Sequence, residues 1–107
     1  MTLSHQQLDQ RCLALHVAVA ACIRARPALL NVARQNLERW RQTNGSLPPS
    51  LEEWRGILDA CSPEEILRLL CDPGPEATRL RQSSPFGGIL SESERLGILK
   101  QYEPRAA

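Results

Sequence analysis

The chain has 107 residues, of which 42% are hydrophobic and 23% are charged, and its net charge is +1. This length suffices for one domain with one modest core, and the near balance of charge does not by itself predict a polyanionic partner. Aromatic residues make up only 4% of the chain and β-branched residues are sparse, which argues against a fold of several strands.

A long first helix is predicted from about Leu8, or slightly earlier, to Arg24. Ser4 and Gln7 match the S-x-x-Q capping box, whose side chains satisfy free backbone N–H groups at a helix start. One stripe at helical spacing is apolar and contains Leu8, Cys12, Leu15, Val19, Cys22 and Ile23. A second apolar face, which indicates either a central helix or a dimer interface, contains Leu13, Val17 and Ala20.

Two further helices are predicted on either side of a stiff connector. Pro27 suits the first turn of the second helix, where its missing N–H has no partner in any case. Asn44-Gly45 favours a C-cap at the end of that helix, and Leu47–Pro49 then forms an extended connector. Ser50 and Glu53 repeat the capping-box spacing, which predicts that Ser50 starts the third helix.

The rest of the chain carries three more helix signals. Ser62 followed by Pro63 combines an N-cap with a proline at the first helical position. Asp72–Pro75 breaks this fourth helix, and a short helix is predicted from residue 76 to about residue 82. Ser91 caps a last helix, which is predicted to end at Pro104.

The pattern as a whole predicts an all-α fold of five to six short helices. Residues 1–107 form a single helical domain, with the connectors at Leu47–Pro49 and Asp72–Pro75 inside it. The apolar run from residue 12 to residue 23 is shorter than the roughly 20 residues that cross a bilayer, so no membrane partner is predicted.

The segment RLRQSSPFGGIL, residues 79–90, interrupts the helical pattern. Pro85 presets one backbone torsion, and the glycines after Phe86 allow backbone conformations that other residues rarely adopt, which is typical of a turn. Phe86 itself is expected to be buried. The polar side chains before the turn suit an anionic partner. The predicted partner-binding residues are Arg79, Arg81, Gln82, Ser83 and Phe86, with Arg81 and Gln82 at least partly exposed; the alternative is that the turn serves the fold alone.

The cysteines and histidines indicate neither a metal site nor an active site. Cys12, Cys22, Cys61 and Cys71 are spaced too widely for a C-x-x-C metal motif, and reduced thiols in a cytoplasmic protein are expected. Cys12 and His16 stand four residues apart and could share a metal, but no second ligand pair is evident, so no metal or cofactor is predicted. Both histidines, His5 and His16, lie in the first helix away from any serine or cysteine nucleophile, and no enzyme is predicted.

Charge is unevenly distributed along the chain. The first 45 residues carry an excess of arginine, whereas the remainder carries an excess of carboxylates. Such asymmetry hints at two faces with different partners. The predicted nucleic-acid contacts are Arg34, Arg39 and Arg41, although no helix-turn-helix spacing and no aromatic platform accompanies them.

The pattern L-R-Q-S-S-P-F-G-G-I-L-S-x-x-E-R over residues 80–95 resembles a tail shared by a group of small bacterial antitoxin-like proteins. The segment A-R-x-N-L-x-R-W over residues 33–40 is also similar, and the resemblance covers about residues 28–100. It implies a non-catalytic protein that binds a toxin, with operator DNA as a further partner.

Three functions therefore stay open at this point. The leading one is a type II antitoxin that binds and neutralises a cognate toxin, through its acidic later helices or through the RQSSPF turn. The alternatives are a DNA-binding transcriptional regulator without a toxin partner, and a structural or adaptor subunit.

Overall fold

The computed structural model describes residues 2–103, which contain six α-helices, one 3₁₀ turn and no strand. The all-α fold predicted from the sequence is therefore confirmed; the predicted helix end at Pro104 lies outside the described residues. The elements in chain order are α1 (His5–Ala25), the 3₁₀ turn η1 (Pro27–Leu29), α2 (Leu30–Asn44), α3 (Pro49–Ala60), α4 (Pro63–Cys71), α5 (Pro75–Arg81) and α6 (Glu92–Gln101).

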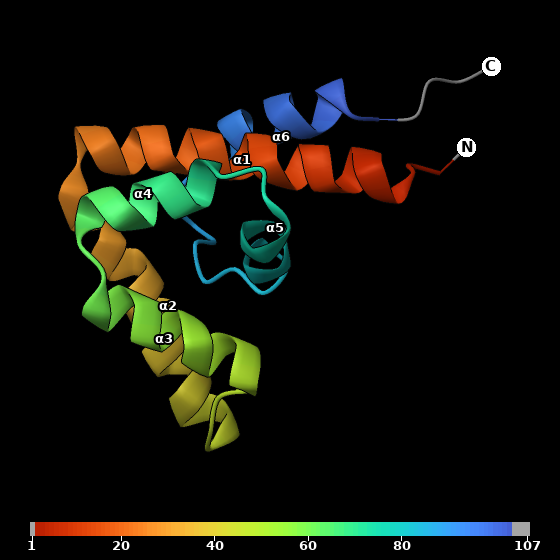
Figure 1. The fold of residues 1–107 in the computed structure, drawn as a ribbon. Helices are drawn as coiled ribbons and strands as arrows, with labels where there is room; N and C mark the ends of the chain where they lie inside the picture. The colour runs from red at the N-terminus through yellow and green to blue at the C-terminus, as the bar shows by residue number, and fades with distance from the viewer. Residues whose placement is uncertain (1, 104–107) are drawn as a thin grey trace.

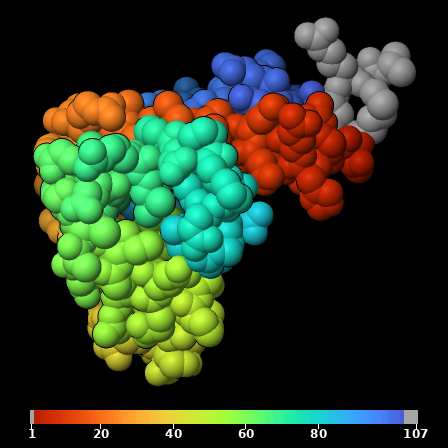
Figure 2. All heavy atoms as spheres, viewed as in Figure 1, coloured from red at the N-terminus to blue at the C-terminus, as the bar shows by residue number. Residues whose placement is uncertain are grey.

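The helices form an L-shaped molecule (Figure 1). Its body consists of α1 with α4, α5 and α6 packed beside it. Its arm consists of α2 and α3, which lie side by side and project away from the end of α1. The space-filling view shows α5 in the corner between the body and the arm (Figure 2).

Three of the helix starts confirm the capping-box pattern. The hydroxyls of Ser4, Ser62 and Ser91 each accept a backbone N–H from three residues further on, and the side chain at that position bonds back to the cap. Gly45 ends α2 with a φ of 80°, the left-handed conformation that glycine adopts without strain. Local side-chain chemistry thus sets these four boundaries.

The predicted start of α3 at Ser50 is wrong. The helix begins one residue earlier, at Pro49, and no side chain caps it. Proline fits the first helical position because it has no N–H to leave unpaired, and Pro75 opens α5 in the same way. The carboxylate of Glu53 bonds instead to Arg79, whose two terminal nitrogens lie 3.0 and 2.9 Å from its oxygens.

The core lies where the arm meets the body. Its largest fully buried side chains are Trp54, Ile23, Leu58, Ile66, Leu70 and Pro85. The indole N–H of Trp54 donates to the carbonyl oxygen of Leu80 at 2.8 Å, and the indole ring meets Phe86 edge to face with centroids 5.2 Å apart. Phe86 is 3% exposed, so its predicted burial is confirmed.

The sequence predicts a second apolar face on α1 that could form a dimer interface, but the residues of this face differ in their exposure. Ala20 has no exposed surface and belongs to the core, so its assignment to a dimer interface is wrong. Leu13 is half-buried and Val17 is 46% exposed, so these two members of the predicted interface do reach the surface. Within residues 2–103, no helix combines the length and the apolar character needed to cross a membrane.

Truncating Phe86 tests where the core lies. Phe86→Ala should lower the free energy of unfolding by about 3–5 kcal/mol, because it removes the ring that packs on Trp54 and leaves a cavity. Leu96→Ala is the matched control: Leu96 is 52% exposed, so its loss should change stability by less than about 0.5 kcal/mol. Urea unfolding followed by the fluorescence of Trp40 and Trp54 measures both, and equal midpoints for the two variants would contradict the assignment.

Candidate partner-binding site

The loop between α5 and α6, residues 82–90, passes over the junction of the arm and the body and is called here the 82–90 loop (Figure 1). Its first turn continues from α5, since the N–H of Ser83 donates to the carbonyl of Leu80. Phe86 N–H donates to Ser84 Oγ at 3.2 Å, which closes a local turn around Pro85. Gly88 has a φ of 91°, a conformation that favours glycine.

A buried asparagine of α2 holds this loop. The side-chain amide of Asn36 donates to the carbonyl oxygens of Pro85 and Gly87, both at 2.9 Å. Its own oxygen accepts from Arg39 at 2.7 Å. The segments 33–40 and 80–95 therefore meet in space, and Asn36 is a key residue that the sequence analysis did not single out.

Arg81 is 3% exposed, so the expectation that it would reach solvent is wrong. Its guanidinium lies at the C-terminal end of α4 and donates to the carbonyl oxygens of Asp72 at 2.6 Å and Leu69 at 3.3 Å. A helix end leaves several carbonyls without backbone partners, and arginine supplies donors to them. Arg81 and Phe86 are both buried and stabilise the fold, so their assignment to a partner-binding surface is wrong.

Arg79 stays partly exposed but is engaged within the molecule. It bonds to both Glu53 on α3 and Glu76 on α5, and these bonds lower the pKa of both carboxyl groups and raise the pKa of Arg79. The pair with Glu53 ties α5 to the arm, so Arg79 would have to give up existing bonds to serve a partner.

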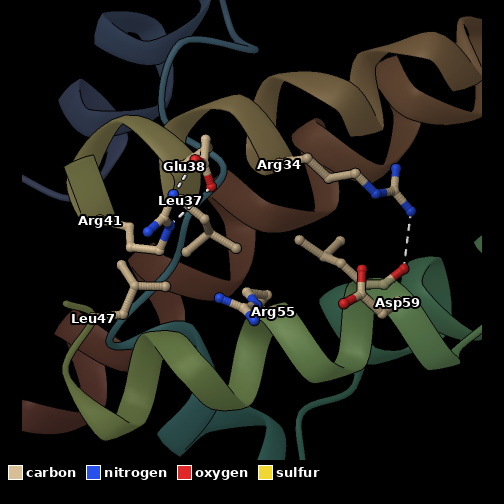
Figure 3. Close-up of a pocket in the computed structure, with 8 residues that line it drawn as sticks. Arg34, Leu37, Glu38, Arg41, Leu47, Arg55 and Asp59 are labelled. Atoms are coloured by element: carbon tan, nitrogen blue, oxygen red, sulfur yellow. Dashed lines mark hydrogen bonds and ion pairs between the residues drawn. The ribbon is translucent and has the colours of Figure 1, made fainter. Parts of the chain in front are cut away.

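The predicted nucleic-acid residues are engaged as well. Arg34 donates to the carbonyl oxygen of Leu58 at 2.9 Å, Arg39 bonds to Asn36, and Arg41 pairs with Glu38. Figure 3 shows the pocket of about 290 Å³ between α2 and α3, which Arg34 and Arg41 line together with other residues of both signs of charge. Arg39 is not part of that lining.

His16 contradicts the prediction that both histidines lie away from any serine. Its Nε2 is 2.7 Å from Ser84 Oγ, and its Nδ1 is 2.8 Å from the carbonyl oxygen of Cys12. Burial lowers the pKa of this imidazole. The Sγ of Cys12 also lies 3.7 Å from Nδ1, and within residues 2–103 no third His, Cys, Asp or Glu joins the pair to make a metal site.

A groove of about 460 Å³ runs between the arm and the 82–90 loop and is called here the arm–loop groove. It is lined by Trp40, Asn44, Pro48, Ser50, Leu51, Gln82, Ser83 and Ser84. Two of the predicted partner-binding residues, Gln82 and Ser83, are in this set. In the described part of the chain, these two residues form hydrogen bonds through their backbone groups only. Their side chains are therefore open to a partner.

Comparisons with known proteins add no assignment. The chain matches no protein-family model, no curated protein and no solved structure. The role of the arm–loop groove is therefore inferred from the residues that line it.

Two adjacent substitutions should separate the roles of Arg81 and Gln82. Arg81→Ala should destabilise the protein by about 1–3 kcal/mol, because buried carbonyls at the end of α4 lose their donor. Gln82→Ala, at an exposed position, should change stability by less than about 0.5 kcal/mol. Thermal unfolding of the two variants decides the matter: an unchanged midpoint for Arg81→Ala would show that the arginine does not brace α4.

Stability should also depend on pH through His16. Because burial lowers the folded pKa below the ordinary value of 6.5, the unfolded chain binds more protons between these two pKa values. The free energy of unfolding should therefore fall as the pH is lowered from about 6.5 to the folded pKa of His16. Urea titrations at a series of pH values measure this slope, and His16→Gln should flatten it; an identical slope in the variant would assign the effect to other groups.

Proposed function

We propose that this protein is a type II antitoxin, a non-catalytic binding protein that holds its toxin through a peptide segment seated in the arm–loop groove. The family resemblance over residues 28–100 supports the antitoxin assignment. The single structural observation that carries the binding role is the lining of the groove, which combines neutral polar side chains with an apolar surface.

The groove chemistry suits a polypeptide. Gln82 and Asn44 carry amides, and Ser83 carries a hydroxyl, so the rim offers both donors and acceptors for the backbone of an extended segment. Trp40 and Leu51 are half-buried and can pack against an apolar side chain of that segment. Aromatic anchors of this kind carry much of the binding energy at protein interfaces.

Charge favours a peptide over nucleic acid at this groove. None of its lining residues is charged, whereas binding of a phosphate backbone depends on Lys and Arg. The alternative of a DNA-binding regulator would rest on Arg34 and Arg41 in the pocket of Figure 3, but Glu38 and Asp59 share that pocket. A nucleic acid there would meet carboxylates beside the arginines, so the toxin-binding proposal is preferred to the regulator alternative.

A matched pair of arginine substitutions tests the proposal. The probe is the product of the reading frame that adjoins the gene, co-expressed with the wild-type protein or a variant. Gln82→Arg places a long charged side chain in the groove and should weaken binding at least about tenfold, or about 1.4 kcal/mol, and reduce neutralisation. Gln35→Arg adds the same side chain at an exposed position of α2 outside the groove and should change neither.

Two measurements make the outcome decisive. Isothermal titration gives the affinity, and growth of the co-expressing cells gives neutralisation, with thermal unfolding to confirm that both variants fold. Equal affinity of the two variants would remove the groove from the interface. Failure of the wild-type protein to bind or neutralise the adjoining product would overturn the antitoxin assignment, and salt-sensitive DNA binding by that protein would favour the regulator.

A further inference from the structure

We propose that Ser84 is a base-activated nucleophile that accepts an acyl group from a small carboxylic ester bound between α1 and the 82–90 loop. His16 is the base in this proposal. The inference rests on the hydrogen bonds around His16 and on the cavity beside it, and not on toxin binding, although Ser84 also lines the arm–loop groove.

The hydrogen bonds fix the tautomer of His16. The carbonyl oxygen of Cys12, 2.8 Å from Nδ1, can only accept, so Nδ1 carries the hydrogen of the neutral ring. Nε2 then has a free lone pair, and the hydroxyl of Ser84 at 2.7 Å must donate to it. A serine that donates to a histidine oriented through its other nitrogen has the arrangement of an activated nucleophile.

The protonation state of His16 suits a base. Burial lowers the pKa of the imidazole, so the ring is neutral at pH 7 and can take the proton of the serine. Phe86 N–H donates to Ser84 Oγ at 3.2 Å, which orients the oxygen and leaves it a second lone pair for attack. The proline that follows Ser84 restricts its backbone to extended conformations.

A cavity gives a substrate access to this pair. Its volume is about 230 Å³, and its lining residues are Leu15, His16, Val19, Ser84, Phe86, Gly87, Gly88, Leu90 and Arg95. Ser84 is half-buried and so within reach of a molecule in the cavity. Apart from Arg95, the wall around Ser84 is mostly apolar and suits a small apolar acyl group.

Two glycines of the 82–90 loop supply backbone N–H groups beside the cavity. Gly87 and Gly88 line the cavity, and within residues 2–103 their backbone N–H groups have no backbone acceptor. Both glycines are exposed, so these N–H groups are free to donate to the carbonyl oxygen of a bound ester as negative charge forms on it. The space beside both glycines is open, since a Cβ added at either would meet no atom within 4 Å.

The proposed step is the transfer of one acyl group. Ser84 Oγ attacks the carbonyl carbon, its proton passes to His16 Nε2, and the carbonyl electron pair moves to the oxygen. The electron pair then returns, the bond to the leaving alkoxide or phenolate breaks, and the imidazolium gives its proton to the leaving group or to solvent. The products are an ester on Ser84 and a free alcohol or phenol, and no oxidant or other reactant is required.

The test uses p-nitrophenyl acetate with the full-length protein. The expected result is release of one equivalent of p-nitrophenolate per chain, with one acetyl group located by mass spectrometry on the peptide that contains Ser84. Ser84→Ala should abolish this labelling, while Ser93→Ala, a control at an exposed serine of α6 outside both the cavity and the arm–loop groove, should leave it unchanged. His16→Gln should slow labelling about 100-fold or more, the usual contribution of a general base.

Mapping the acetyl group guards against misassignment, because Lys100 and the four cysteines are also potential acceptors. An acetyl group found only on those residues, or equal labelling of wild type and Ser84→Ala, overturns the proposal. So does an unchanged rate in a folded His16→Gln variant, since the Ser84 bond would then only satisfy a buried imidazole. Should His16→Gln fail to fold, the wild-type map and the two serine variants still decide the outcome.

Discussion

The amide of Asn36 is the contact on which the arrangement of this molecule most depends. It bonds to two carbonyl oxygens of the 82–90 loop, which lie 49 and 51 residues further along the chain, and so joins α2 to that loop. A buried amide that loses such partners costs about 1–3 kcal/mol for each group left unsatisfied. With the loop held, Phe86 reaches Trp54, Ser84 reaches His16, and one wall of the arm–loop groove is in place.

Arginine braces the rest of the fold. Arg81 bonds to carbonyls at the end of α4, Arg34 bonds to the carbonyl of Leu58 near the end of α3, and Arg39 orients the Asn36 amide. The planar guanidinium has five donors in a fixed fork, so one side chain can satisfy several acceptors. At least three of the arginines in this chain, which has a single lysine, thus serve contacts inside the molecule. A cluster of arginines in a sequence can therefore serve the internal needs of helix ends as well as an external anion.

The features that could be predicted from the sequence are the local ones. Capping boxes at Ser4, Ser62 and Ser91 depend on residues three apart, and each was correctly placed. The start of α3 was misplaced because Glu53 bonds to Arg79, a partner 26 residues away that no local pattern reveals. The hydrogen bond between His16 and Ser84 could not be predicted for the same reason, because these residues lie 68 positions apart in the sequence. Exposure of Arg81 could not be judged either, since it depends on how α5 packs against the end of α4.

The 82–90 loop places two adjacent serines in different surroundings. Ser83 lines only the arm–loop groove, whereas Ser84 lines both that groove and the cavity under α1, where its hydroxyl bonds to His16. An acyl group on Ser84 Oγ would remove the hydrogen that His16 Nε2 accepts, and the buried imidazole would be left without a donor. The loop could restore that bond only by moving, and such movement would alter the wall of the groove, because Ser83 and Ser84 share one short segment. Chemistry at the cavity and binding at the groove, although proposed on separate observations, would therefore be coupled through the same backbone.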